Sequence, residues 1–138
     1  MTLADACQNG LMDSTDTYGV VLAGGSSSRM GFDKASIDIG GVTLIERAVY
    51  ALAEVVAGGS VAPDGVEVIQ DVHPGRGPLS GLDAAYEVAN GRSIFLLGVD
   101  MPFVDARAIR KIIGSEIDAD GARLPIADGR VQPLCALY

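Results

Sequence analysis

Residues 18–25 read YGVVLAGG, a short apolar run that stops at two adjacent glycines. A run that is apolar on both faces and bounded by glycine is typical of a strand buried in a parallel sheet. Residues 66–69 and 93–99 repeat the pattern, and residues 123–126 and 131–138 add two late strand segments around an Asp-Gly turn. Segments whose apolar residues recur at helical spacing lie between these first three strands. The order predicts an α/β protein, a Rossmann-like three-layer sandwich whose mostly parallel sheet carries helices on both faces.

The first helix is predicted to begin at Thr43, because Thr43 and Glu46 form a capping-box pattern. Apolar residues then recur at helical spacing on one face, namely Ile45, Ala48, Leu52 and Val55. We expect this face to pack against the sheet as part of the core. Gly58-Gly59 is predicted to end the helix.

Two further helices are predicted, one after each of the next two strands. The first of them starts at Pro78 or Ser80 and ends at the C-cap Asn90-Gly91. Its apolar face is predicted to hold Leu82, Ala85, Tyr86 and Ala89. The second is capped by Asp105 and closed by Gly114.

Three polar segments directly follow the three predicted parallel strands, at residues 24–34, 71–81 and 100–102. Right-handed crossovers place the carboxyl ends of parallel strands at one edge of the sheet. Ligands of such sheets bind at that edge, near the point where the strand order reverses. We therefore expect the three segments to converge on one binding site.

The composition limits the classes of partner. The chain has 138 residues, 49% hydrophobic and 5% aromatic, which is enough for one domain with an aliphatic core. Ten basic and 18 acidic residues give a net charge of −8, which argues against a nucleic acid or an anionic membrane as the main partner. Isolated cysteines, no secretory signal pattern and no bilayer-length apolar run predict a cytoplasmic, soluble protein. We expect a flexible tail over residues 1–17 and one domain over 18–138.

The loop after the first strand has the chemistry of a phosphate site. Gly24-Gly25 lets the backbone approach a ligand closely, and successive free N–H groups in such a loop attract anions. Arg29 and Lys34 add positive charge. The loop contains neither a Walker motif nor the dinucleotide-binding G-x-G-x-x-G pattern. The alternative is an ordinary strand-to-loop turn with solvated charges.

The whole string L-A-G-G-x-S-x-R-M-G-x-D-K, from Leu22 to Lys34, resembles the signature of the molybdenum cofactor guanylyltransferases, the MobA-like nucleotidyltransferases. Similarity continues through residues 68–81, with G-P-L-x-G, through LLGVDMPFV at 96–104, and through QPLCALY at 132–138. The resemblance implies the nucleotide-diphospho-sugar transferase type of fold. It also implies transfer of GMP from GTP to the phosphate of molybdopterin, with Mg²⁺ as cofactor and release of pyrophosphate.

The resemblance also implies a role for each matching residue. Backbone contacts to the guanine and ribose would come from Leu22, Ala23 and Gly24. The phosphates would be held by Gly25, Arg29 and Lys34. The nucleoside side of GTP would contact Asp71. Both GTP and Mg²⁺ would contact Asp100. The resemblance thus makes Arg29, Lys34 and Asp100 the catalytic set.

The position of Asp100 supports its role independently. It ends an apolar strand and precedes Met101-Pro102, so its carboxylate should project toward the ligand, and Mg²⁺ prefers one or two carboxylates with phosphate oxygens and waters. A helix-capping or turn aspartate is the alternative. Asp71 has the same alternative, since turn aspartates often precede Pro-Gly loops. His73, in that loop, is more typical of an exposed residue than of a general base. Arg76 is at least as typical of an exposed loop residue as of a contact to the acceptor's phosphate.

Two departures from the family pattern keep other readings open. The stretch 56–60 lacks the Asn that the family usually places after its second strand, which bears on base selectivity. Family members also continue well past the late strand, whereas this sequence stops at Tyr138. We therefore expect a truncated chain, or a homo-oligomer or partner that covers the C-terminal edge. The rival functions are a related cytidylyltransferase acting on molybdopterin or a sugar or polyol phosphate, and a GTP-binding module without turnover.

Overall fold

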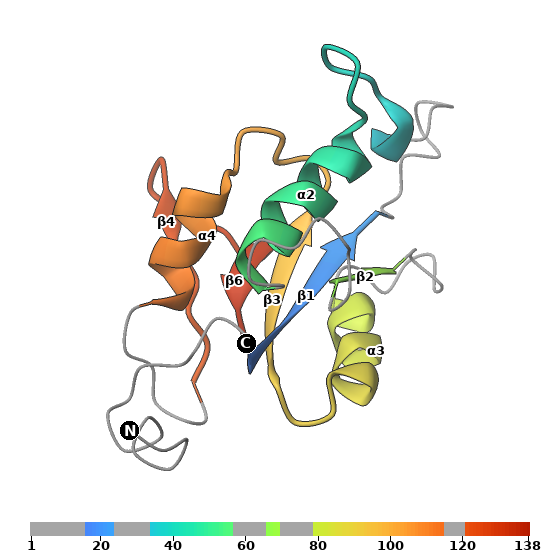
Figure 1. Ribbon diagram of the computed structural model, residues 1–138. Coiled ribbons are helices and arrows are strands. Elements are labelled where there is room, and N and C mark those ends of the chain that lie inside the picture. Colours follow the sequence, from blue (N-terminus) through green and yellow to red (C-terminus); the bar gives the residue numbers. More distant parts are fainter. Residues whose placement is uncertain (1–15, 24–33, 57–65, 70–78, 115–120) are drawn as a thin grey trace, which may run out of the picture.

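The computed structural model describes five stretches of the chain (Figure 1), at residues 16–23, 34–56, 66–69, 79–114 and 121–138. Within these stretches, none of the helices has the length and apolar character needed to cross a membrane. Two predictions fall outside the described residues. They are the tail over residues 1–15 and the stop of the first helix at Gly58-Gly59.

A four-stranded sheet forms the centre of the molecule, in the order β2-β1-β3-β6. The strand β1 (Thr17–Leu22) pairs in parallel with both β2 (Val66–Ile69) and β3 (Ser93–Gly98). The last strand, β6 (Cys135–Leu137), is antiparallel to β3. The prediction of a sheet that contains parallel strands, in a mixed α/β fold, is confirmed. β1 begins one residue earlier than predicted, because Thr17 pairs with the first residue of β3.

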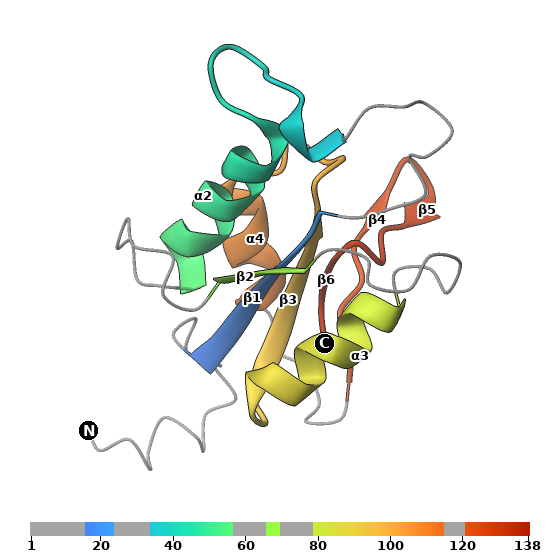
Figure 2. The same ribbon diagram turned by 90° about the vertical axis from the view of Figure 1, so that its right-hand side faces the viewer.

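Helices pack on both faces of this sheet (Figures 1 and 2). One face is covered by α2 (Leu44–Val56) and α4 (Ala106–Ile113), and the other by α3 (Leu79–Ala89). The larger core cluster, on the α2 and α4 side, includes Val21, Leu52, Phe95, Leu97 and Ile109. The smaller cluster, under α3, includes Val20, Leu22, Leu82, Ala85 and Leu96. Successive residues of β1 and β3 thus enter opposite clusters, as side chains of a strand must.

The first predicted helix forms as its capping pattern requires. The backbone N–H of Thr43 donates to Glu46 Oε2 at 2.8 Å, and the N–H of Glu46 donates to Thr43 Oγ1 at 3.3 Å. This reciprocal pair satisfies two donors that a helix start leaves without partners. The predicted apolar face also packs inward, since Ala48, Leu52 and Val55 are buried and Ile45 packs against them.

The helix α3 also forms, but one residue of its predicted face is wrong. Leu82, Ala85 and Ala89 are buried, whereas Tyr86 is 53% exposed. The buried stripe runs along the i, i+3, i+7 positions, and Tyr86 at i+4 lies beyond its edge, so the phenol ring faces solvent. The predicted stop is confirmed, because Asn90 and Gly91 have φ values of 54° and 81°, the left-handed conformation of a helix C-cap.

The late segment is more divided than predicted. A hairpin joins β4 (Ile126–Ala127) to β5 (Arg130–Val131) through Asp128 and Gly129, both at positive φ. The predicted strand over 131–138 is interrupted, because Pro133 has no N–H to donate and a turn joins the Cys135 N–H to the Gln132 carbonyl at 3.2 Å. The outer edge of β6 pairs with Arg123 through two backbone hydrogen bonds to Leu137.

Candidate functional site

The carboxyl ends of the three parallel strands lie at one edge of the sheet, as predicted. Leu22, the last residue of β1, is in register with Ile69 at the end of β2 and with Gly98 at the end of β3. The Val99 N–H also donates to the Leu22 carbonyl at 3.2 Å, so β1 and β3 stay joined to their last residues. The three polar segments of the sequence therefore leave the sheet from neighbouring points.

The end of β1 is held by close packing with the start of α3. Leu22 is buried and its side chain belongs to the cluster under α3. A Cβ atom added to Gly81 would stand 2.4 Å from Leu22 Cδ2, so only glycine lets the helix approach this closely. Leu22 thereby places the backbone of the following Ala23, which is partly buried, at the edge of the sheet. Their predicted backbone contacts to guanine and ribose start from this point.

Asp100 lies at the end of β3 with an exposed side chain. Its carboxylate is close to the strand end, because a Cβ atom added to Gly98 would be 2.8 Å from Asp100 Oδ1. No hydrogen bond or ion pair joins this carboxylate to another of the described residues. Asp100 is therefore exposed just after β3, and its predicted contact with a ligand stays a prediction.

Lys34 begins a short 3-10 helix, η3 (Lys34–Ser36), whose Ala35 is buried. In both ribbon views η3 lies beside the carboxyl ends of β1 and β3 (Figures 1 and 2). The side chain of Lys34 is exposed, and within the described ranges it forms no ion pair. The structure thus describes two of the three predicted catalytic residues, Lys34 in η3 and Asp100 just after β3.

The start of β6 reaches this edge too. The Gly98 N–H donates to the Leu134 carbonyl at 2.7 Å, and Leu134 Cβ would be 3.3 Å from a Cβ atom on Gly98. The late segment 132–138, which is part of the family resemblance, therefore lies next to the end of β3. The loop after Asp100 adds an exposed aromatic side chain, since Phe103 is 93% accessible.

Several predicted site residues fall outside the described residues, so their placement stays a prediction. They are Gly24, Gly25, Arg29 and Asp71, and the loop residues His73 and Arg76 lie outside the described ranges as well.

Two glycines of this edge were missed as site residues. Gly98 leaves room for the Asp100 carboxylate, and Gly81 leaves room for Leu22. Gly98 is the last residue of β3, and Gly81 lies in the first turn of α3. Each stands next to a segment with candidate ligand contacts. That position is a signal in the sequence, because glycine within a regular element is unfavourable unless another group must come close.

The family comparison covers almost the entire domain. Residues 19–138 match the model of the MobA-like NTP transferase domain. The molybdenum cofactor guanylyltransferase of Sinorhizobium fredii is 35% identical over 147 residues, covering 93% of this chain and 67% of the relative. A probable molybdenum cofactor guanylyltransferase of Pelotomaculum thermopropionicum is 36% identical over 128 residues, covering 87% of this chain and 62% of the relative.

A solved structure is similar as well. The molybdopterin-guanine dinucleotide biosynthesis protein A of Archaeoglobus fulgidus superposes with a TM-score of 0.53 at 26% identity, covering 88% of this chain and 66% of that one. The chain thus spans about two thirds of the length of the relatives it matches. On the strength of a match from residue 19 to residue 138, the chain belongs to the MobA-like NTP transferase family, a family of nucleotidyltransferase enzymes.

Proposed function

We propose that this chain transfers GMP from GTP to the phosphate of molybdopterin and releases pyrophosphate. The observation that carries the proposal is the match over residues 19–138, together with relatives at 35% and 36% identity that are named as molybdenum cofactor guanylyltransferases. The register of the strand ends supports it, because the three polar segments of the sequence follow strands whose last residues are aligned at one edge of the sheet. The Rossmann-like three-layer form of the fold is part of the same proposal.

In this proposal GTP lies across the ends of β1 and β2. Backbone groups of Leu22, Ala23 and Gly24 contact the guanine and ribose, and Asp71 contacts the nucleoside. The phosphates are held by Gly25, Arg29 and Lys34. The exposed side chain of Lys34 supports this assignment, since an ammonium group needs to reach solvent to meet a phosphate.

The donor set at the end of β3 fits Mg²⁺. Asp100 offers exposed carboxylate oxygens, and the described residues contain no cluster of three or more His, Cys, Asp or Glu side chains that could hold a metal by themselves. Mg²⁺ commonly uses one or two carboxylates and completes its shell with substrate phosphates and water. When bound, Mg²⁺ would neutralise charge on the phosphates of GTP.

The residues of the chain act mainly by positioning. An oxygen of the molybdopterin phosphate attacks the α-phosphorus of GTP, the new O–P bond forms, and the bond from the α-phosphorus to the pyrophosphate oxygen breaks. Phosphoryl-type transfer needs in-line alignment and stabilisation of charge more than proton transfer. Arg29 and Lys34 stabilise the negative charge that moves onto pyrophosphate. His73 has no step in this scheme.

The experiment is a pyrophosphate-release assay on the 138-residue chain with molybdopterin, using GTP or CTP, with and without Mg²⁺. Release with GTP and Mg²⁺ is the expected result. Release with CTP instead would move the function to the cytidylyltransferase branch. GTP binding by calorimetry with no release from either nucleotide would identify a binding module and overturn the proposed activity.

The cellular location of the protein and its partners are proposals as well. We propose that the protein works in the cytoplasm, where GTP is available. We also propose that a second copy or another partner contacts the edge formed by β6. Size-exclusion chromatography with light scattering on the 138-residue chain tests for the second copy.

A further inference from the structure

Arg47, in the first turns of α2, reaches back toward the loop that precedes the helix. Its Nη2 donates to the Ile39 carbonyl. Its Nε is buried and has no hydrogen-bond partner among the described residues. A guanidinium group that is partly desolvated without full pairing contributes poorly to stability. The contact of Arg47 with Ile39 instead joins the loop to the helix.

The loop from η3 to α2 is tied together by short backbone links. The Ile37 N–H donates to the Lys34 carbonyl at 3.2 Å, and the Leu44 N–H donates to the Ile37 carbonyl at 2.9 Å. The Ile39 N–H donates to the Val42 carbonyl at 3.0 Å. Lys34 is therefore linked through Ile37 to the first residue of α2.

The chain reverses direction after Ile39, where Arg47 contacts the loop. Gly40 and Gly41 follow Ile39 with φ values of 70° and 86°, so the chain reverses there through two residues with little conformational preference. The Gly41 N–H donates to Asp38 Oδ1 at 2.7 Å, which closes the turn from one side. Arg47 is the residue of the helix whose side chain donates to this turn, and it joins the turn to α2.

We propose that Arg47 is a positioning residue that holds the loop 37–43, and through it the ammonium group of Lys34, against the phosphates of GTP. The inference rests on the proposed function, because it takes Lys34 as a phosphate ligand. In this proposal Arg47 acts through the loop, which its Nη2 contacts at Ile39. Loss of its hydrogen bond leaves Lys34 chemically intact but attached to a loop with more conformations, so binding must order more of the chain.

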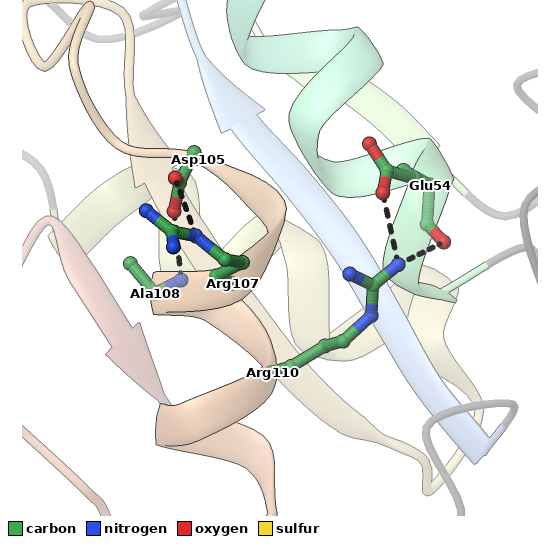
Figure 3. Close-up of polar contacts among 5 residues, drawn as sticks. All are labelled: Glu54, Asp105, Arg107, Ala108 and Arg110. Carbon is green, nitrogen blue, oxygen red and sulfur yellow. Dashed lines mark hydrogen bonds and ion pairs between the residues drawn. The ribbon is translucent and has the colours of Figure 1, made fainter.

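The test is a double-mutant cycle in which GTP affinity is measured by calorimetry with Mg²⁺. Arg47→Met removes the donors and keeps most of the apolar stem, so the helix packing is largely preserved. Lys34→Ala removes the ammonium group, and the double variant combines both changes. Arg110→Met is the matched control, because Arg110 Nη2 also donates to a backbone carbonyl, that of Glu54 at 3.4 Å, at the far end of α2 (Figure 3).

We expect Arg47→Met to weaken GTP binding about tenfold, with Arg110→Met unchanged. We also expect Arg47→Met to cause no further loss of GTP affinity in the Lys34→Ala background. Arg47 acts on the affinity only through the Lys34 ammonium group, which that variant lacks. Arg47→Lys should recover part of the affinity, since an ammonium group can still donate to Ile39.

Three outcomes would overturn the role of Arg47. They are unchanged affinity in Arg47→Met, an equal loss in Arg110→Met, or losses that add fully in the double variant. A merely structural role predicts the last of these, because general destabilisation acts with or without Lys34. If Lys34→Ala itself binds GTP with full affinity, the phosphate role of Lys34 in the proposed function fails, and the role of Arg47 fails with it.

Discussion

Two aspartates that are five residues apart follow β3, and their surroundings in the structure differ. Asp105 caps α4, where Oδ1 accepts from the Ala108 N–H at 2.9 Å and Oδ2 lies 3.3 Å from Arg107 Nε (Figure 3). Asp100 lies in the turn two residues after the strand and forms no such bond to any residue in the described part of the chain. Both are exposed. The Asp105 carboxylate thus serves the start of α4, whereas the Asp100 carboxylate has no partner in the described stretches, and its ligand role stays a prediction.

The difference also appears in the proton affinity of the capping group. The hydrogen bond from the Ala108 N–H, opposed by some desolvation and aided by Arg107, lowers the pKa of Asp105 below its ordinary value. The helix start explains this, because its free N–H groups favour a negative charge. A carboxylate at a helix start is therefore no sign of a ligand site. A carboxylate just after a strand, without a local hydrogen-bond donor, is a stronger sign of a ligand site.

The largest effect is expected from Asp100→Asn, which keeps the shape and removes the charge. We expect Mg²⁺-dependent release of pyrophosphate to fall at least about 100-fold, because the proposed metal ligand is lost. The fold should persist, since the side chain is exposed. Steady-state kinetics and circular dichroism measure both. Asp105→Asn is the matched control and should keep its activity. A full rate in Asp100→Asn would remove the contrast between the two aspartates.

Gly98→Ala tests the space behind Asp100 rather than its charge. The new Cβ would stand 2.8 Å from Asp100 Oδ1 and 3.3 Å from Leu134 Cβ, so the carboxylate must move. We expect kcat/KM to fall about tenfold, because misplacement of a ligand group raises the barrier. The measurement is the same assay with GTP and Mg²⁺. Gly114→Ala, at the end of α4, is the control that should keep full kcat/KM. Equal activity of both variants would show that Gly98 has no part in the site.

Asp105→Ala should act on stability alone. Loss of the cap should lower Tm at pH 7 by a few degrees and leave kcat unchanged. The sign with pH follows from the lowered pKa. The charged cap stabilises the fold above the unfolded pKa, near 3.8, and its contribution is lost as the pH falls through the lower folded value. Calorimetry at pH 7 and below pH 3 should show the difference from the parent protein shrinking with acid. A constant difference would contradict a charged cap.

The smallest effect is expected from Arg107→Ala. The pair with Asp105 is exposed, with side-chain accessibilities of 90% and 54%, so solvent screens most of its attraction. We expect Tm to change by less than about 1 °C, and calorimetry at low and high salt measures it. A change as large as that of Asp105→Ala would mean that the ion pair, and not the Ala108 N–H, makes Asp105 a structural residue.

Much of the secondary structure could be read from local signals. The capping box at Thr43, the cap at Asp105 and the left-handed stop at Asn90 each involve residues within four positions of one another. Such contacts form in nearly any surroundings, which is why sequence reasoning found them. The prediction that Tyr86 lies on the buried face of α3 was wrong, because the width of a buried stripe depends on how much sheet lies beneath the helix. That width is not a local property.

The candidate site divides in the same way. Asp100 and Lys34 are predicted as ligand residues because each lies in a segment that follows a strand and matches a family motif, and these roles stay predictions. The room behind Asp100 could not be predicted, because the distance between Gly98 and the Asp100 carboxylate depends on how the chain turns after β3. The contact of Arg47 with Ile39 was also not predicted, since eight residues and a turn separate them.

By itself, the sequence determined the order of strands and helices, the caps, the family and the identities of the candidate ligand residues. These depend on local spacing and on motifs that need no knowledge of distance. Only the tertiary structure decided that β6 runs antiparallel beside β3, that Leu22 aligns with both Ile69 and Gly98, and that Gly81 and Gly98 carry close contacts. Strand order, register and close approach are set by packing between segments far apart in the chain, which local spacing does not encode.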